Sequence, residues 1–82
     1  MSLFGSSYDD EKLKNEALNA IDENPTIRGL PNINIISEKG NISIFGSVKN
    51  DKQKKEVQQA IKKKYHDNNI DYESIEIELK SE

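Results

Sequence analysis

The chain holds few side chains whose type and spacing suit catalysis. Its single histidine, His66, is followed directly by Asp67, and histidine is the side chain that most often transfers protons in enzymes. Acid–base work also needs a positioned partner in a cleft. These two residues instead lie among polar residues at an expected helix end, where a cationic imidazole suits the helix dipole. We therefore interpret His66 as a surface residue, and we expect no catalytic residue and no enzymatic activity.

The acidic residues do not follow the pattern of a metal site. Asp9, Asp10 and Glu11 are consecutive, so on a helix their carboxylates do not converge on one ion. One histidine without any cysteine provides no ligand set for a transition metal, and the chain has neither EF-hand nor phosphate-loop spacing. We interpret the three acids as the solvated first turn of a helix, and we expect no metal and no cofactor.

Charge is divided between two segments of the chain. Residues 9–23 hold six acidic residues and two lysines, whereas residues 50–66 hold six lysines and two acidic residues. Opposite charges favour placing the two segments side by side and leave one edge of the surface basic. If the second segment is a helix, its outward lysines, called the lysine face below, are Lys52, Lys55, Lys62 and Lys63. An ordinary solvated surface is the simplest interpretation of this face.

Nucleic acid is not an expected partner. The net charge of the chain is −3, whereas domains that bind nucleic acid usually carry a basic surplus. The sequence also lacks the GxxG loop of a KH module and the paired aromatic residues of an RNP motif.

Length and composition favour one small domain without disulfides, because the chain has 82 residues and no cysteine. No apolar run approaches the ~18 residues that a membrane span needs. The first residues lack the basic start and apolar region of a signal peptide. We expect a flexible segment at residues 1–8 and a single domain at residues 9–80. As it stands, the sequence predicts a cytoplasmic protein, or a periplasmic or envelope protein if the chain is processed or trimmed.

Apolar spacing predicts two helices and three strands. The helices are expected at residues 9–23 and 51–65, and the strands at residues 32–38, 41–49 and 74–80. Ser7 followed by Asp10 indicates the first N-cap, and Asn50 or Asp51 indicates the second. Asn24 precedes a proline and ends the first helix, because a residue before proline is pushed out of the α region.

The order α-β-β-α-β predicts an α+β fold, with two helices packed on one face of a three-stranded mixed sheet. The other face is then open to solvent, and its expected residues are Asn34, Ile36, Ser43, Phe45, Ser47, Glu76 and Glu78. On this face Ile36 and Phe45 can form a small apolar patch, although exposing a ring forfeits about 2 kcal/mol of possible burial. We interpret the patch as a candidate partner face. A half-buried ring covered by lysine stems, or by Leu3 and Phe4, is the alternative.

Two glycines of the expected hairpin have structural roles. Gly40 lies in the short connection between the strands and is placed to take a positive φ. Gly46 interrupts the inward row of Ile42, Ile44 and Val48, which indicates either the close approach of a helix backbone or a bend.

This hairpin resembles that of the BON domain, a small module of bacterial envelope and osmotic-stress proteins. The family's hairpin has a turn glycine, alternating aliphatic residues, a second glycine and a further aliphatic residue, which here are Gly40, Ile42, Ile44, Gly46 and Val48. Leu13, Ala17 and Leu18 also match the family's first helix, and the resemblance covers about residues 9–79. The chain departs from the family before the last strand, where it lacks a Gly-Val pair and has a longer connection.

The resemblance implies a non-catalytic binding module that mediates protein–protein or phospholipid-surface contact in a bacterial envelope-associated assembly. It makes the lysine face a candidate contact for anionic phospholipid, with each basic group contributing about 1 kcal/mol near such a surface. Two alternatives remain open. The order of elements is also similar to that of homo-oligomerising ring-building modules in secretion and sporulation machines. A cytoplasmic BON protein linked to potassium suggests an ion-binding or small-ligand-binding role instead.

Overall fold

A computed structural model describes residues 8–28 and 32–81 of the chain. The elements are α1 (Asp10–Asp22), β1 (Ile33–Glu38), β2 (Asn41–Val48), α2 (Asp51–Asp67) and β3 (Ser74–Ser81). Their order is the expected one, and their ends lie within two residues of the expected ends. Residues 1–7 of the expected flexible segment lie outside the described residues. Tyr8 is half-buried against the core.

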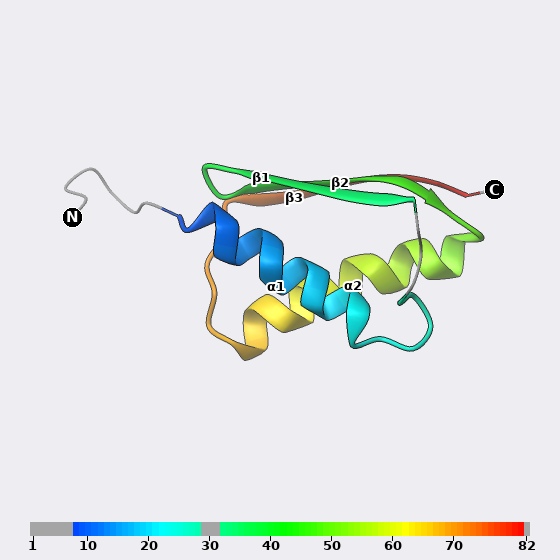
Figure 1. The fold of residues 1–82 in the computed structure, drawn as a ribbon, viewed down its shortest axis with the longest axis horizontal. Coiled ribbons are helices and arrows are strands. Elements are labelled where there is room, and N and C mark those ends of the chain that lie inside the picture. The colour runs from blue at the N-terminus through cyan, green and yellow to red at the C-terminus, as the bar shows by residue number, and fades with distance from the viewer. Residues whose placement is uncertain (1–7, 29–31, 82) are drawn as a thin grey trace.

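The three strands form one open mixed sheet in the order β1-β2-β3. β1 and β2 are an antiparallel hairpin, whereas β3 runs parallel to β2. A parallel neighbour needs a crossover connection, and α2 provides it. Both helices lie on the same side of the sheet, and the other side carries no helix (Figure 1). The predicted α+β fold with two helices on one face is therefore confirmed.

The core lies between this sheet face and the two helices. Its buried side chains are Leu13, Ala17, Ala20, Ile21, Ile27, Ile35, Ile42, Ile44, Val48, Val57, Ile61, Tyr65 and Leu79. The inward rows of both helices and of β2 agree with the apolar periodicity of the sequence. Ile27 is fully buried although it belongs to the α1–β1 loop, a contribution to the core that periodicity does not predict.

Tyr65 joins the two helices inside the core. Its hydroxyl donates a 2.7 Å hydrogen bond to the backbone carbonyl of Leu13, and no part of its surface is exposed. Burial in this apolar setting raises the pKa of the Tyr65 phenol. Its ring also lies 5.2 Å, centroid to centroid, from that of Tyr72. The phenol therefore stays a neutral donor that fixes the position of α2 against α1.

The helix starts are capped by side chains. The α1 N-cap is Asp9, whose carboxylate accepts a 3.1 Å bond from the Lys12 N–H. The sequence predicts Ser7 as the N-cap of α1, but Ser7 lies outside the described residues. The observed N-cap, Asp9, corrects that prediction. For α2 the cap is Asn50, one of the two expected residues. It accepts from Gln53 N–H, while the Gln53 side chain accepts from Lys49 N–H, both at 2.9 Å.

The β1–β2 turn takes positive φ angles at both of its central residues. Lys39 has φ 52° and Gly40 has φ 84°. Two such residues between paired strand ends are typical of a type I′ hairpin turn, whose twist matches that of the strands. A side chain at position 40 would also begin 2.5 Å from the Tyr8 ring. The expected role of Gly40 is confirmed.

Gly46 has a φ of 135°, which side chains rarely adopt, and a Cβ there would overlap the backbone carbonyl oxygen of Asn32. That carbonyl accepts a 3.0 Å hydrogen bond from the Ser47 N–H at the end of the hairpin. The close neighbour of Gly46 is therefore the entry of β1, and the expected approach of a helix backbone is wrong. The local departure from strand geometry agrees with the other expectation, a bend.

Candidate functional site

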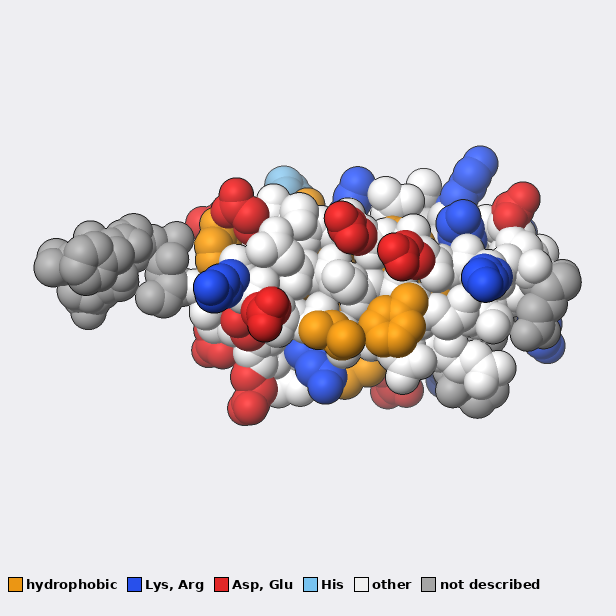
Figure 2. Space-filling model, turned by 90° about the horizontal axis from the view of Figure 1, so that it is seen from above, with side chains coloured by type: hydrophobic (Ala, Val, Ile, Leu, Met, Phe, Trp, Pro, Cys, Tyr) orange, Lys and Arg blue, Asp and Glu red, His pale blue; other side chains and the backbone are white. Residues whose placement is uncertain are grey.

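The open face of the sheet carries the apolar patch that the sequence predicts. Ile36 is 54% exposed and Phe45 is 36% exposed. Ile36 pairs with Ser43 and Phe45 pairs with Asn34, so the two side chains are diagonal neighbours on adjacent strands. Figure 2 looks onto this face and shows a small hydrophobic patch near its centre with acidic groups beside it. The alternative prediction, in which Leu3 and Phe4 cover the Phe45 ring, involves residues outside the described ranges.

The acidic groups beside the patch come from β3. Glu78 is paired with Phe45 across the parallel β2–β3 ladder, and Glu76 is paired with Ser43. Both glutamates are exposed. The open face thus combines the two apolar side chains of the patch with a negatively charged border. Such a surface is complementary to a partner that presents apolar and basic groups.

On the opposite side of the molecule, all four residues of the lysine face are exposed. Lys63 donates a 2.9 Å bond to Asp67, and no other residue of this face has an ion pair within the described part of the chain. The structure does not bring the four together at one place. Lys52, Lys55 and Lys63 line one groove of about 540 Å³, whereas Lys62 lines a separate hollow of about 480 Å³ beside His66.

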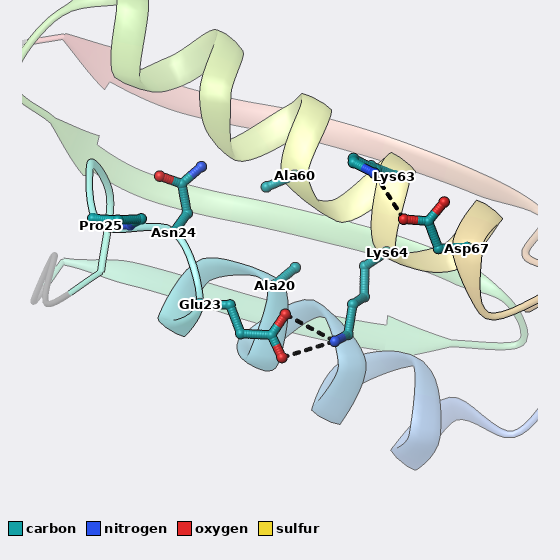
Figure 3. Close-up of a pocket in the computed structure, with 8 residues that line it drawn as sticks. All are labelled: Ala20, Glu23, Asn24, Pro25, Ala60, Lys63, Lys64 and Asp67. Carbon is teal, nitrogen blue, oxygen red and sulfur yellow. Dashed lines mark hydrogen bonds and ion pairs between the residues drawn. The ribbon is translucent and has the colours of Figure 1, made fainter.

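A second hollow of about 470 Å³ continues this groove toward the end of α1. This hollow and the 540 Å³ groove share three lining residues, Asn24, Ala60 and Lys63. Together they form one groove between α2 and the α1–β1 loop. Figure 3 shows Ala20 and Ala60 on facing helices, with charged side chains around them. The small alanine side chains leave the space that the groove occupies.

The charges in this part of the groove are already paired. Lys64 lies 2.9 Å from both carboxylate oxygens of Glu23 and 4.0 Å from Glu16 (Figure 3). The hydrogen bond with Glu23 raises the pKa of Lys64, and the bond from Lys63 lowers the pKa of Asp67. The pairs of Lys64 with Glu23 and Glu16 hold α2 beside the end of α1, as expected from the opposite charges of the two segments, whereas the Lys63–Asp67 pair lies within α2. Among the described residues, the groove lysines without an ion pair are Lys52 and Lys55, and Glu56 lines the same end of the groove.

The residues first considered for catalysis and metal binding do not converge. Asp67 accepts from Lys63, while the exposed His66 lines the hollow on the other side of the helix, beside Asn69 and Asp71. Within residues 8–28 and 32–81, no three His, Cys, Asp or Glu side chains lie close enough together to hold a metal ion. Neither α1 nor α2 is long and apolar enough to cross a membrane.

Asp10 has a structural role that its sequence position does not indicate. Its carboxylate accepts bonds from the N–H groups of Lys39 at 2.7 Å and Gly40 at 2.9 Å, and from the Ser37 hydroxyl at 3.2 Å. The backbone bond from Gly40, followed by that from Lys39, holds the pKa of Asp10 below its ordinary value of 3.8. The first turn of α1 is thereby bound to the hairpin turn.

Comparison of the chain with models of protein families found no match, and no curated protein matches it either. The resemblance to the BON domain therefore stays a prediction from the sequence.

Proposed function

We propose that this chain is a non-catalytic, BON-like binding module that contacts a protein partner through the open face of its sheet, in an assembly associated with the bacterial envelope. The observation that carries the proposal is the exposure of Ile36 and Phe45 side by side on this face. A small domain gains most of its stability from apolar burial, so leaving an aromatic ring at the surface costs it stability. Docking of the face onto a partner would recover that burial.

Substitution of the patch tests the proposal. The double variant Ile36→Ser and Phe45→Ser is expected to fold, because both side chains lie outside the core, with a loss of stability of about 1 kcal/mol. It should fail to retain proteins that the unmodified chain captures from an extract of its own cells, as measured by quantitative mass spectrometry. Light scattering of the purified chain at high concentration would identify a second copy as the partner.

The matched control is Leu18→Ser. Leu18 is 44% exposed on α1, so this variant removes a surface hydrophobic residue away from the open face. It should retain the same proteins as the unmodified chain. Equal retention by all three chains would refute the open face as the contact. Unfolding of the double variant would instead show that the patch contributes to the core, and unfolding of Phe45→Ser alone would assign that contribution to Phe45.

A second candidate function is contact with an anionic phospholipid surface through the lysine face. The observation that favours it is the exposure of four lysines along α2, of which only Lys63 has an ion pair among the described residues. Lysine side chains near an anionic bilayer each contribute about 1 kcal/mol. The outer face of α2 carries no exposed large apolar residue that could insert between lipids. Such contact would therefore be electrostatic, weak and sensitive to salt.

A further inference from the structure

The β3 strand has an edge that is available for hydrogen bonding. β2 occupies the middle of the sheet, so β3 has a strand on one side only within the described part of the chain. The Ser74 N–H donates to the carbonyl of Gly40 at 3.3 Å. Because backbone groups alternate in direction along a strand, those of Ser74, Glu76 and Glu78 point toward β2. The N–H and C=O groups of the alternate residues, Ile75, Ile77 and Leu79, therefore point outward.

The apolar side of this edge is incompletely covered. Ile75 and Ile77 point toward the helices but stay partly exposed, whereas Ile42 and Ile44, their partners on β2, are fully buried. The core is thus open along β3, where one more strand with apolar side chains would complete it. The inward residues of β1 have a different chemistry, because they include Ser37, whose hydroxyl is bound by Asp10, beside the partly exposed Ile33 and the buried Ile35.

The other side of the same edge is acidic. Glu76 and Glu78 are exposed on the open face, two residues apart along β3. If two copies of this chain paired antiparallel through β3, these glutamates would lie against those of the second copy, and like charges across a ladder are destabilising. An incoming strand with lysine or arginine on that side would instead form cross-strand pairs with both of them.

We propose that β3 accepts an added strand from an extended segment of another protein in which basic and apolar residues alternate. Its basic side chains would lie beside Glu76 and Glu78, and its apolar side chains would cover Ile75 and Ile77. Backbone bonds to the outward groups of Ile75, Ile77 and Leu79 would hold it, which is the mode of peptide recognition called strand addition. Glu76 and Glu78 border both this edge and the Ile36–Phe45 patch, but the outward backbone groups of β3 belong to the edge alone, so the inference does not depend on the proposed function.

A short synthetic peptide of alternating lysine and valine is the probe, with binding to the full chain measured by fluorescence anisotropy. We expect saturable binding, and we expect the amide signals of Ile75, Ile77 and Leu79 to shift in NMR spectra. A glutamate–valine peptide of equal length should not bind. Absence of binding by the lysine peptide, or amide shifts confined to α2, would overturn the proposal.

Two N-methylated versions of the peptide separate strand addition from simple charge attraction. One carries N-methyl groups on the valines and the other on the lysines, so that each blocks one edge of the peptide while charge and composition stay equal. Strand addition predicts that one version binds like the parent and the other binds at least about tenfold more weakly, because several hydrogen bonds are lost together. Equal binding of both versions would refute strand addition.

Variants of the chain complete the test. The double variant Glu76→Gln and Glu78→Gln should weaken binding of the lysine peptide by roughly three- to tenfold, through loss of the cross-strand charge pairs. Phe45→Ser is the matched control on the same face and should bind the peptide as the unmodified chain does. Equal loss in both variants would place the peptide on the patch and overturn the assignment to the β3 edge.

Discussion

At the scale of single residues, Gly46 occupies a position where a side chain would cause both backbone strain and steric overlap. Its φ of 135° lies in the range that favours glycine, and the carbonyl oxygen of Asn32 fills the space that a Cβ would need. The same carbonyl is bonded to the Ser47 N–H. The missing side chain in the inward row of β2 is therefore a requirement of how β1 enters the sheet.

We expect Gly46→Ala to destabilise the fold by about 3 kcal/mol or to prevent folding, because the carbonyl of Asn32 must move and its hydrogen bond is then lost. Urea unfolding followed by circular dichroism measures the change. Ser43→Ala, a small substitution on the open side of the same strand, should stay within about 0.5 kcal/mol of the unmodified chain. A Gly46→Ala chain of unchanged stability would contradict this account.

At the scale of elements, the first turn of α1 and the β1–β2 turn form one unit through Asp10. Its carboxylate binds the backbone N–H groups of Lys39 and Gly40. The same turn is bonded to the start of β3, because the Gly40 carbonyl accepts from the N–H of Glu73, the residue before β3, at 2.7 Å and from that of Ser74 at 3.3 Å. Three segments that are distant in sequence thus meet at Gly40, and this end of the molecule depends on an ionised Asp10.

The lowered pKa of Asp10 gives this contact a defined pH dependence. A carboxyl whose pKa is lower in the folded state stabilises the fold at pH values above its unfolded pKa, and this stability is lost as the pH falls through the folded pKa. Asp10→Asn should therefore be less stable than the unmodified chain at neutral pH. The difference should shrink below the ordinary value of 3.8. Urea unfolding at a series of pH values measures it.

The control for this prediction is Asp22→Asn, which removes an equal charge from the other end of α1. Asp22 is exposed and forms no ion pair with another described residue, so its substitution should change stability by less than about 0.5 kcal/mol at neutral pH. A stability difference for Asp10→Asn that stays constant down to pH values well below 3.8 would show that the carboxylate charge is not what matters.

At the scale of the whole molecule, the two candidate contact surfaces lie on opposite sides of one thin domain. The open sheet face has an apolar centre and an acidic border, and the lysine face lies on the outer side of α2. Ion pairs between Lys64 and α1 neutralise the basic charge nearest to the other helix. The exposed lysines of the lysine face, by contrast, lie along α2.

For the lysine face, we expect weak sedimentation of the chain with anionic vesicles at low salt. Binding should disappear near an ionic strength of about 1 M, where the Debye length is about 3 Å. The double variant Lys52→Gln and Lys55→Gln should lose most of this binding, because two contributions of about 1 kcal/mol each are removed. Absence of binding at low salt would end the phospholipid proposal.

A control variant that loses the same two charges elsewhere on the chain shows whether vesicle binding depends on the lysine face or on net charge alone. Lys39→Gln with Lys80→Gln removes two exposed lysines that belong to the hairpin turn and to β3. This variant should bind vesicles as the unmodified chain does. Equal loss of binding in both double variants would mean that the net charge of the chain, and not the lysine face, controls attachment.

The sequence alone was sufficient for the elements and for the side that each one buries. Apolar spacing identifies the inward rows of both helices and of β2, and proline and glycine identify the end of α1 and the hairpin turn. The exposure of Ile36 and Phe45 follows from the same alternation, because a strand that buries Ile42 and Ile44 must direct Phe45 to the other face. These features depend on residues close together in the chain.

Tertiary structure decided which distant groups meet. The binding of Asp10 to Gly40, the contact of Asn32 with Gly46, and the pairing of Lys64 with Glu23 join residues far apart in sequence, for which local periodicity has no signal. The same holds for the parallel pairing of β2 with β3, which leaves one edge of β3 without a neighbouring strand in the described part of the chain. Local backbone preference and apolar periodicity determine each element, whereas only the packing of all five elements determines which surfaces and edges remain available.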